Sequence, residues 1–234
     1  AVERVVALPA YRELALAGAH HHARAASRAR GASLGYDFHL AAAGPQLIEI
    51  NTNPGGGLLN ELLREAQRAC CAPVADALGV GQNGVVSVFL AMFRAELSLA
   101  RPGAVLRSVA IVDDEPEAQY LYPEFVLFQA LFRRHGIEAL IAAPAELKIR
   151  DGRLVHADGA VDLVYNRLTD FALDEPAHAA MRAAWFDDLA LITPHPRAHA
   201  LYADKRRLVT LGDPGALARR GVGADDAALL ERHV

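Results

Sequence analysis

The sequence predicts a protein of the α/β class. Short apolar runs of strand type alternate with amphipathic helical patterns over residues 105–198, which indicates a small doubly wound domain. Upstream, two strand-type runs at residues 34–40 and 46–52 flank an Ala/Gly/Pro connection, which indicates an antiparallel hairpin. Helical patterns surround this hairpin on both sides, so the chain combines a parallel sheet with a separate hairpin region.

Composition describes an ordinary globular protein. The chain has 234 residues, 53% of them hydrophobic and 22% charged, enough for a sizeable core in one large domain or two small ones. A formal net charge of −4 gives no basic footprint, so we expect no nucleic-acid partner. No apolar run approaches the roughly 18 residues that span a bilayer, so we expect a protein that does not enter the membrane. Adjacent cysteines such as Cys70 and Cys71 rarely form a structural disulfide, so we expect a reducing, cytoplasmic location.

The elements follow in order along the chain. Residues 1–30 read as helix interrupted near Pro9, and we expect the consecutive His20, His21 and His22 to point about 100° apart on a helix and to face solvent without converging on an ion. The remaining expected elements are helices at 58–78 (broken near Pro73) and 85–99, a strand–helix–strand unit at 109–112, 118–135 and 137–142, a hairpin around residues 151–152, a strand within 160–168, a helix at 177–189, a strand within 189–194, and helices at 199–211 and 225–233.

A line of polar side chains ends the predicted hairpin. Glu49, Asn51 and Asn53 alternate along the strand and therefore share one face, with Ile48 and Ile50 on the other. Carboxylate and amide oxygens at this spacing suit Mg²⁺. The glycines at 55–57 would let a substrate approach the backbone and aim N–H groups at an anion. The alternative interpretation is a polar sheet face that runs into a turn.

Two basic residues are further candidates. Arg167 follows an apolar strand at the end where open α/β sheets place ligands, and its planar fork suits a carboxylate; an ion pair with Asp162, Asp170 or Asp174 is the alternative. Lys205 opens a helical turn, where a compact ammonium suits phosphate. The alternative for Lys205 is an ordinary surface lysine.

Other segments with metal-binding or reactive side chains are weaker candidates for a functional site. The acidic segment 113–117 after a strand could hold a metal or a ribose, but a helix cap explains it better. His195 and His199 lie in a proline-containing loop without a third ligand at usable spacing. Nothing in the sequence resembles a Ser or Cys nucleophile, a Walker loop or a GxGxxG dinucleotide motif.

Four segments in order carry a family resemblance: "LGYDFHL…GPQLIEINTNPGG", "VAIVDDE", "VDLVYNR" and "ADKRRL". Together they resemble the circularly permuted ATP-grasp ligases, the group that includes eukaryotic-type glutathione synthetase, over about residues 30–215. The resemblance implies a partial ATP-grasp fold with an inserted α/β substrate-binding domain. The implied divisions are an N-terminal ATP-grasp part at 1–104, the inserted domain at 105–198, and the start of a further ATP-grasp segment at 199–234.

The resemblance to this family implies roles for individual residues of the chain. The resemblance implies Mg²⁺ ligands at Glu49 and Asn51, a contact of Lys205 with ATP phosphates, and a grip of Arg167 on a substrate carboxylate. The nucleotide would lie beside Asp37 and the backbone near His39 and Ile48. The implied substrate contacts, besides Arg167, are Asn53, Gly55, Gly56, Gln82 and Asn83.

The resemblance implies an ADP-forming carboxylate–amine ligase that uses ATP and Mg²⁺, acts on small molecules and is compatible with a homodimer. Two departures put glutathione itself in doubt, because the family has arginine where this chain has Gly35 and tyrosine where it has Asp170. In the family a glycine-rich lid and another metal-binding carboxylate follow the lysine, so we expect a chain that lacks the C-terminal part of the ATP-grasp fold. A non-catalytic ligand-binding or scaffold module is the main alternative, and a nucleotide-sugar transferase that binds nucleotide near Asp113 is another.

Overall fold

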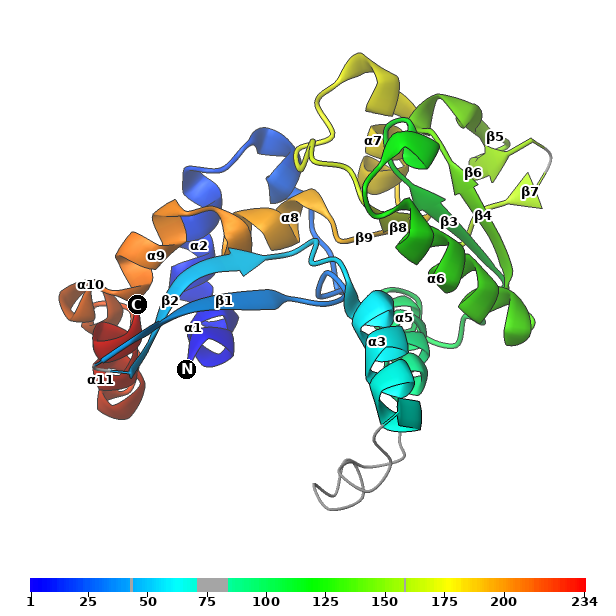
Figure 1. The fold of residues 1–234 in the computed structure, drawn as a ribbon. Coiled ribbons are helices and arrows are strands. Elements are labelled where there is room, and N and C mark those ends of the chain that lie inside the picture. The colour runs from blue at the N-terminus through cyan, green and yellow to red at the C-terminus, as the bar shows by residue number, and fades with distance from the viewer. Residues whose placement is uncertain (43, 71–83, 158) are drawn as a thin grey trace.

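The computed structural model describes residues 1–42, 44–70, 84–157 and 159–234. It shows a mixed α/β protein with three parts: the hairpin β1–β2, a surrounding set of short helices that includes both ends of the chain, and an α/β unit built on a parallel sheet (Figure 1). The helices α3 and α5 lie where the hairpin region meets the α/β unit.

A four-stranded parallel sheet forms the centre of the α/β unit. Its strands are β3 (Ser108–Val112), β4 (Glu138–Ala142), β8 (Leu163–Asn166) and β9 (Leu191–Thr193), in the order β4-β3-β8-β9. The chain thus leaves β3 toward β4 on one side, and later enters β8 on the other side of β3. This order confirms the predicted parallel α/β unit and its strand–helix–strand beginning.

Apolar side chains cover both faces of this sheet. On one face α5 (Val85–Ala100) and α6 (Tyr122–Arg134) pack against Val109, Ile111 and Tyr165, with Phe93 fully buried among aromatic rings. On the other face α7 (Ala179–Phe186) and the three-stranded sheet β5-β6-β7 cover the opposite side chains of the same strands. The predicted helix at 85–99 therefore packs on the sheet, although the sequence places it outside the inserted domain.

The second hairpin forms around the predicted turn. Strands β5 (Leu147–Arg150) and β6 (Arg153–His156) flank Asp151 and Gly152, and both turn residues have positive φ. The two-residue turn with φ above zero at both positions is the geometry that Asp-Gly favours. A short strand β7 (Gly159–Ala160) pairs with β6.

The hairpin of β1 (Gly35–Ala41) and β2 (Gly44–Asn51) is antiparallel as predicted, but it contains a β-bulge. Asp37 pairs with Glu49 and Phe38 with Leu47, so Ile48 is an extra residue on β2. The expectation that Ile48 and Ile50 lie on one common face of the strand is wrong. Ile50 and Leu47 are buried and Ile48 is 54% exposed, because the bulge breaks the strict alternation of side chains.

Short helices pack beneath the hairpin and bury its apolar face. Leu47 and Ile50 contact a core that includes Val5, Tyr11 and Leu201. Tyr11 is fully buried and donates its hydroxyl hydrogen to the Leu201 carbonyl at 3.2 Å. This core buries Leu47 and Ile50, while Glu49 and Asn51 remain partly exposed.

The helices of the described residues begin and end as follows. The α-helices are α1 (Val2–Ala7), α2 (Pro9–Ala17), α3 (Gly57–Cys70), α5 (Val85–Ala100), α6 (Tyr122–Arg134), α7 (Ala179–Phe186), α8 (Pro196–Ala198), α9 (Arg206–Leu211), α10 (Pro214–Ala218) and α11 (Ala224–His233); the short 3-10 turns are η1 (His21–Arg24), η2 (Pro116–Ala118), η3 (Pro144–Glu146) and η4 (Pro176–His178), and η5 (His199–Ala203) is a π-helical turn. The predicted interruption at Pro9 and the helix predicted at 225–233 are confirmed. The helix predicted at 199–211 is divided, because extended backbone at Asp204 separates the π-helical turn η5 from α9.

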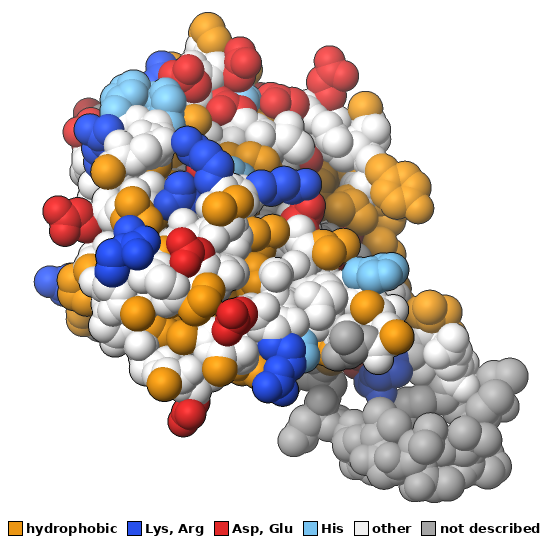
Figure 2. Space-filling view, turned by 90° about the vertical axis from the view of Figure 1, so that its left-hand side faces the viewer, with side chains coloured by type: hydrophobic (Ala, Val, Ile, Leu, Met, Phe, Trp, Pro, Cys, Tyr) orange, Lys and Arg blue, Asp and Glu red, His pale blue; other side chains and the backbone are white. Residues whose placement is uncertain are grey.

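The surface gives two negative findings. Within the described residues no helix combines the length and the apolar character needed to cross a bilayer. Basic and acidic side chains are interspersed on the face shown in Figure 2, with no continuous basic stripe on that face. This distribution agrees with the small net charge of −4.

Candidate functional site

The polar face of the hairpin carries a group of four side chains, Asp37, Glu49, Asn51 and Lys205, which we call the hairpin cluster. Lys205 Nζ lies 3.0 Å from Glu49 Oε2, although the two residues are 156 positions apart in the sequence. Asn51 Nδ2 donates to Asp37 Oδ2 at 3.0 Å across the strand pair. The structure therefore brings together the two residues expected to hold Mg²⁺ and the lysine expected to contact phosphate.

Local structure explains how the hairpin cluster forms. Asp37 and Glu49 are direct partners in the β1–β2 register, and Asn51 follows Glu49 by two residues on the same strand. Lys205 is the residue that precedes α9, whose Leu208 and Leu211 pack in the core beneath the hairpin. Packing of α9 thus fixes the backbone of Lys205 beside β2.

Charge in the hairpin cluster favours the ionised carboxylate. The hydrogen bond from Lys205 and then that from the Asn51 amide hold the pKa of Glu49 below its ordinary value. Glu49 is about one-third exposed and Lys205 about three-quarters exposed, so both side chains remain open to a ligand. Two carboxylates and the Asn51 Oδ1 atom make a set of oxygen donors that fits a hard cation such as Mg²⁺.

The two remaining nucleotide-contact candidates lie on the same hairpin. His39 is exposed on β1 opposite Gln46. Ile48 is the extra residue of the bulge and presents its side chain to solvent. His39 and Ile48 thus lie on the same strand pair as the hairpin cluster, and their contact with a nucleotide stays a prediction.

Arg167 links the hairpin to the sheet. Its Nη1 donates to the Pro54 carbonyl and to the Tyr165 hydroxyl, both at 3.1 Å, and its Nη2 donates to the Asn53 carbonyl at a longer 3.4 Å. The alternative of an ion pair with Asp162, Asp170 or Asp174 does not occur among the described residues. Arg167 is 6% exposed, so in this structure it holds the segment that follows β2 against the C-terminal end of β8.

The glycine run is explained by contacts within the protein. A Cβ added to Gly55 would lie 2.2 Å from Leu121 Cδ1, and one added to Gly57 would lie 2.5 Å from the Phe89 ring. Gly56 has φ +87°, a conformation that side chains other than glycine disfavour. The close approach that the glycines permit is therefore to neighbouring side chains of this chain.

The expected anion at the glycine run also comes from the protein itself. The buried Glu124 carboxylate accepts hydrogen bonds from Gly56 N at 2.6 Å and Leu58 N at 2.9 Å. These amides lie at the start of α3, where a negative charge is favoured. The expectation that the glycine-run N–H groups bind a substrate anion is thus corrected for these two amides, because Glu124 already uses them.

The Asn53 side chain also holds the segment after β2 against the end of β8. Its Nδ2 donates to the Arg167 carbonyl at 2.9 Å, so Asn53 and Arg167 hold each other's backbone. The Asn53 Oδ1 atom and the neighbouring Thr52 Oγ1 are buried and have no hydrogen-bond partner among the described residues. Buried acceptors without partners are costly, which makes this junction a candidate for a ligand donor or a water.

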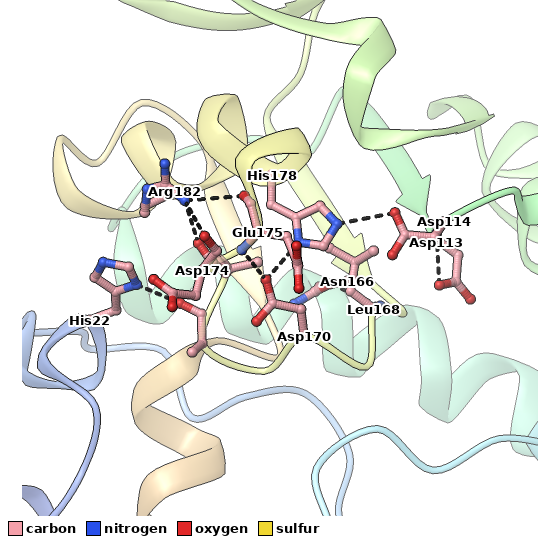
Figure 3. A network of polar contacts seen from close by, with 12 residues as sticks. His22, Asp113, Asp114, Asn166, Leu168, Asp170, Asp174, Glu175, His178 and Arg182 are labelled. Carbon is pink, nitrogen blue, oxygen red and sulfur yellow. Dashed lines mark hydrogen bonds and ion pairs between the residues drawn. The ribbon is translucent and has the colours of Figure 1, made fainter.

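A second polar group lies at the carboxyl ends of β3 and β8, and we call it the sheet-edge cluster: Asp113, Asp114, Asp170 and His178 (Figure 3). His178 is 1% exposed and lies between two carboxylates, with Nδ1 2.7 Å from Asp170 Oδ2 and Nε2 3.1 Å from Asp114 Oδ1. Both ring nitrogens can donate only when the imidazole is protonated. The cluster thus holds a buried, charged histidine between two aspartates.

The helix start expected at residues 113–117 forms only in part: the short turn η2 begins with Pro116 and has Glu117 in its first turn, but no side-chain capping bond forms. Asp113 Oδ1 accepts from the Asp114 backbone N–H at 2.9 Å, and the short turn η2 that follows has no side-chain cap. Glu115 adopts positive φ at the start of this turn, and Asp114 Oδ1 lies 3.1 Å from His178 Nε2. The acidic segment therefore contributes to the sheet-edge cluster.

Burial and charge shift the pKa values in this cluster. Burial raises the pKa of Asp113 from 3.8 to about 6, against the opposing effects of the Asp114 N–H and the Arg167 charge. Burial alone would lower the pKa of His178, but the bonds to Asp114 and Asp170 outweigh it and the net shift is upward. Shifted groups of both kinds at one sheet edge are typical of ligand sites.

The strand order of the parallel sheet independently indicates a ligand site at the sheet-edge cluster. The chain leaves β3 toward β4 and leaves β8 toward β9, which lie on opposite sides. In open parallel sheets ligands bind in the crevice outside the carboxyl ends of two such strands. Arg167 immediately follows β8, so the sheet-edge cluster and the hairpin cluster are joined through Arg167 and the glycine run.

Some candidates lie elsewhere or were missed. Gln82 and Asn83 fall outside the described residues. His178 was not anticipated, because its partners Asp114 and Asp170 are 64 and 8 residues away and no spacing rule connects them. The sequence did contain one relevant feature, the acidic segment directly after a buried strand.

Comparison with known proteins adds no relative, since neither the family models nor the curated proteins contain a match to this chain. The function must therefore be inferred from the two clusters and the elements that position them.

Proposed function

We propose that this chain belongs to an ATP-dependent ligase that joins a carboxylate to an amine, with the hairpin cluster as its Mg-nucleotide site. The observation that carries the proposal is the 3.0 Å contact between Lys205 Nζ and Glu49 Oε2. The resemblance to the circularly permuted ATP-grasp ligases requires these two distant residues to share one site. The packing of α9 under the hairpin brings the Lys205 backbone to β2, and the Lys205 side chain then reaches Glu49.

Each side chain of the hairpin cluster has a distinct task. Glu49 and the Asn51 carbonyl oxygen would hold Mg²⁺, supported by Asp37, which fixes the Asn51 amide through its nitrogen. Lys205 would exchange its bond to Glu49 for one to the nucleotide phosphates, which a compact ammonium suits. The bound cation supplies charge neutralisation for the phosphoryl group.

The reaction needs positioning more than covalent chemistry. The acid substrate's carboxylate oxygen attacks the γ-phosphorus of ATP, the bond to the β-phosphate oxygen breaks, and ADP leaves from an acylphosphate. The amine then attacks the acyl carbon and releases inorganic phosphate and a proton, leaving an amide. Such transfer is accelerated chiefly by placement and by stabilised charge, which the rigid hairpin and the loop clamped by Arg167 provide.

Arg167 is proposed to orient the acid substrate. Its Nη2 contact to the Asn53 carbonyl is long at 3.4 Å, so it is the contact most easily exchanged for a substrate carboxylate. The unpartnered Asn53 Oδ1 lies in the same segment and would accept from a substrate donor after that exchange. The remaining Arg167 bonds to Pro54 and Tyr165 would keep the guanidinium in place.

The test measures Mg-ATP binding by calorimetry on the full-length gene product. Glu49→Gln removes the metal-binding charge while keeping the side-chain size, and Lys205→Ala removes the phosphate contact. We expect each to weaken Mg-ATP binding at least tenfold. The matched controls are Glu13→Gln and Lys148→Ala, both exposed and outside the cluster, and these should bind as the unmodified protein does.

The outcomes separate the alternatives. Absence of nucleotide binding in the folded protein would support the non-catalytic module. Nucleotide binding that is insensitive to Glu49→Gln but lost in an Asp114→Asn variant would support the transferase. Both results would contradict the ligase proposal.

A further inference from the structure

The three consecutive histidines near the N-terminus form a cluster that the ligase proposal does not use. The sequence interpretation places His20, His21 and His22 on a helix, pointing apart. In the structure α2 ends at Ala17, His20 has extended backbone geometry, and the 3-10 turn η1 begins at His21. The expectation that the rings diverge is therefore wrong, because the residues do not share one α-helix.

The change of backbone brings the rings together. Ring centroids lie 4.4 Å apart for His20–His21, 4.4 Å for His20–His22 and 4.1 Å for His21–His22. One nitrogen from each of the three rings lies within 4.8 Å of the others. An ion bound by two imidazoles holds their nitrogens about 3–3.5 Å apart at the usual bond length of about 2.0–2.1 Å, so modest rotations of the two exposed rings suffice.

His22 is the buried member of the cluster, and one of its ring nitrogens is fixed by the protein. It is 5% exposed, and its Nδ1 lies 2.7 Å from the Ala172 carbonyl oxygen, which can only accept, so Nδ1 carries the hydrogen (Figure 3). In the neutral tautomer with hydrogen on Nδ1, the other ring nitrogen, Nε2, has the lone pair that binds a metal. A histidine whose second nitrogen donates to a backbone carbonyl is the arrangement that supports most imidazole–metal bonds.

The elements around His22 are fixed. Trp185 Nε1 donates to the His22 carbonyl at 2.8 Å, and the Phe186 ring contacts the His22 ring edge-on with centroids 5.1 Å apart. The loop that supplies the Ala172 carbonyl is held by Arg182 Nη1, which donates to Leu173 O at 2.8 Å (Figure 3). The carbonyl that orients His22 is therefore itself held in place.

The same loop places a carboxylate beside His20. Asp174 Oδ1 lies 3.8 Å from His20 Nε2, and Asp174 is 66% exposed. Its charge would stabilise a bound dication, either directly or through a hydrogen bond to a ligating ring. His20 Nδ1 accepts from His22 N at a weak 3.4 Å, a contact that ring rotation can release.

We propose that His20, His21 and His22 bind one transition-metal ion of the Zn²⁺ class, with Asp174 as the supporting carboxylate. Imidazole ligands suit such ions rather than Mg²⁺, so this site and the hairpin cluster differ in the metal they take. Three protein ligands leave a coordination position for water or a further ligand. The exposed His20 and His21 adjust, while the buried His22 anchors the ion.

The test is titration of Zn²⁺ into the protein, produced without any histidine tag and freed of metal with a chelator, followed by calorimetry. Because the chain has ten histidines, Co²⁺ absorption spectra of the same protein check that one ordered site is filled. We expect one ion per chain with micromolar or tighter affinity. His21→Gln, which replaces an exposed side chain, should weaken Zn²⁺ affinity at least tenfold, and Asp174→Asn should weaken it by a smaller factor.

His156→Gln is the matched control, since His156 also lies near one carboxylate but away from the cluster. It should leave Zn²⁺ affinity and the Co²⁺ spectrum unchanged. Equal losses in the His156 and His21 variants, an unchanged affinity in His21→Gln, or binding at several weak equivalent sites would overturn the proposal. Circular dichroism of each variant confirms that its fold is retained, and none of these readouts depends on nucleotide binding.

Discussion

Asp113 is a carboxyl group that the folded protein prefers to keep protonated, and its replacement gives a direct test of the sheet-edge cluster. It is 8% exposed, and burial raises its pKa from 3.8 to about 6. Because the folded-state pKa is the higher one, the folded protein binds the proton more tightly than the unfolded chain. Stability from this group is therefore present below about pH 4 and is lost as pH rises through about 6.

The magnitude follows from the shift. At 1.36 kcal/mol per pKa unit, the rise from 3.8 to about 6 corresponds to about 3 kcal/mol. Because the unfolding assay begins at pH 4.5, above the unfolded-state pKa, part of this change lies outside its range, and we expect about 1–2 kcal/mol in measurement. Asp113→Asn keeps an acceptor for the Asp114 N–H and removes the charge.

The assay is urea unfolding of both proteins between pH 4.5 and 8. The free energy of unfolding of Asp113→Asn, relative to the unmodified protein, should increase by about 1–2 kcal/mol across this range. His178 titrates in both proteins, so its direct contribution cancels in the difference. Asp187→Asn, at an exposed position, is the control and should give a flat difference. A flat difference for Asp113→Asn, or one that falls with pH, would refute the reasoning.

Three further substitutions test the elements that join the two clusters. Gly55→Ala forces a Cβ against Leu121 and should destabilise the protein by about 1–3 kcal/mol in urea unfolding, whereas Gly223→Ala, with open space around it, should change stability by less than about 0.5 kcal/mol. Glu124→Gln has one carboxyl-type oxygen fewer and can no longer accept from both Gly56 N and Leu58 N, so the free energy of unfolding should fall by about 1.5–3 kcal/mol. The control Glu117→Gln, at an exposed position, should leave it unchanged. Equal effects of the two substitutions would contradict the role assigned to Glu124. His178→Gln should lower the free energy of unfolding by about 1.5–3 kcal/mol at pH 6, because the protonated imidazole makes both aspartate bonds. This difference from the unmodified protein should shrink as pH rises through the raised pKa of His178. A difference that grows with pH would contradict a charged His178.

Much of the fold was predictable because its signals are local. The apolar strand at 109–112, the helix after it and the strand at 138–142 are defined by period and by glycine or proline at their ends, and all three form. The Asp151–Gly152 turn is likewise specified by two adjacent residues. Such features need no knowledge of distant contacts.

The errors arise where distant residues decide local geometry. The bulge at Ile48 depends on how β1 and β2 pair and on the core beneath them, and a single strand's alternation cannot reveal it. The histidines converge because Trp185 and Ala172, more than 140 residues later in the chain, hold His22 in a 3-10 turn that does not continue the α-helix α2. Glu124 replaces the expected external anion at Gly56 for the same reason, since no local pattern in the glycine run points to it.

The candidate site was predictable in its residue types but only partly in its partners. The sequence indicates Glu49 and Asn51 in one segment and Lys205 in another, and the structure places all three in one cluster. Arg167 was selected from its place after a strand, but its bonds to the carbonyls of Asn53 and Pro54 could not be read from that place. His178 escaped selection because a buried histidine between two aspartates has no spacing signature.

The most direct measurement is anomalous diffraction from crystals of the full-length protein grown with Mn²⁺ and a non-hydrolysable ATP analogue. Mn²⁺ replaces Mg²⁺ at oxygen-ligand sites and marks its own position. We predict an anomalous peak within coordination distance of the Glu49 carboxylate and Asn51 Oδ1, with Lys205 Nζ on a phosphate oxygen of the analogue. A peak with nucleotide beside Asp113 and Asp114, and none at the hairpin cluster, would contradict the proposed ligase site.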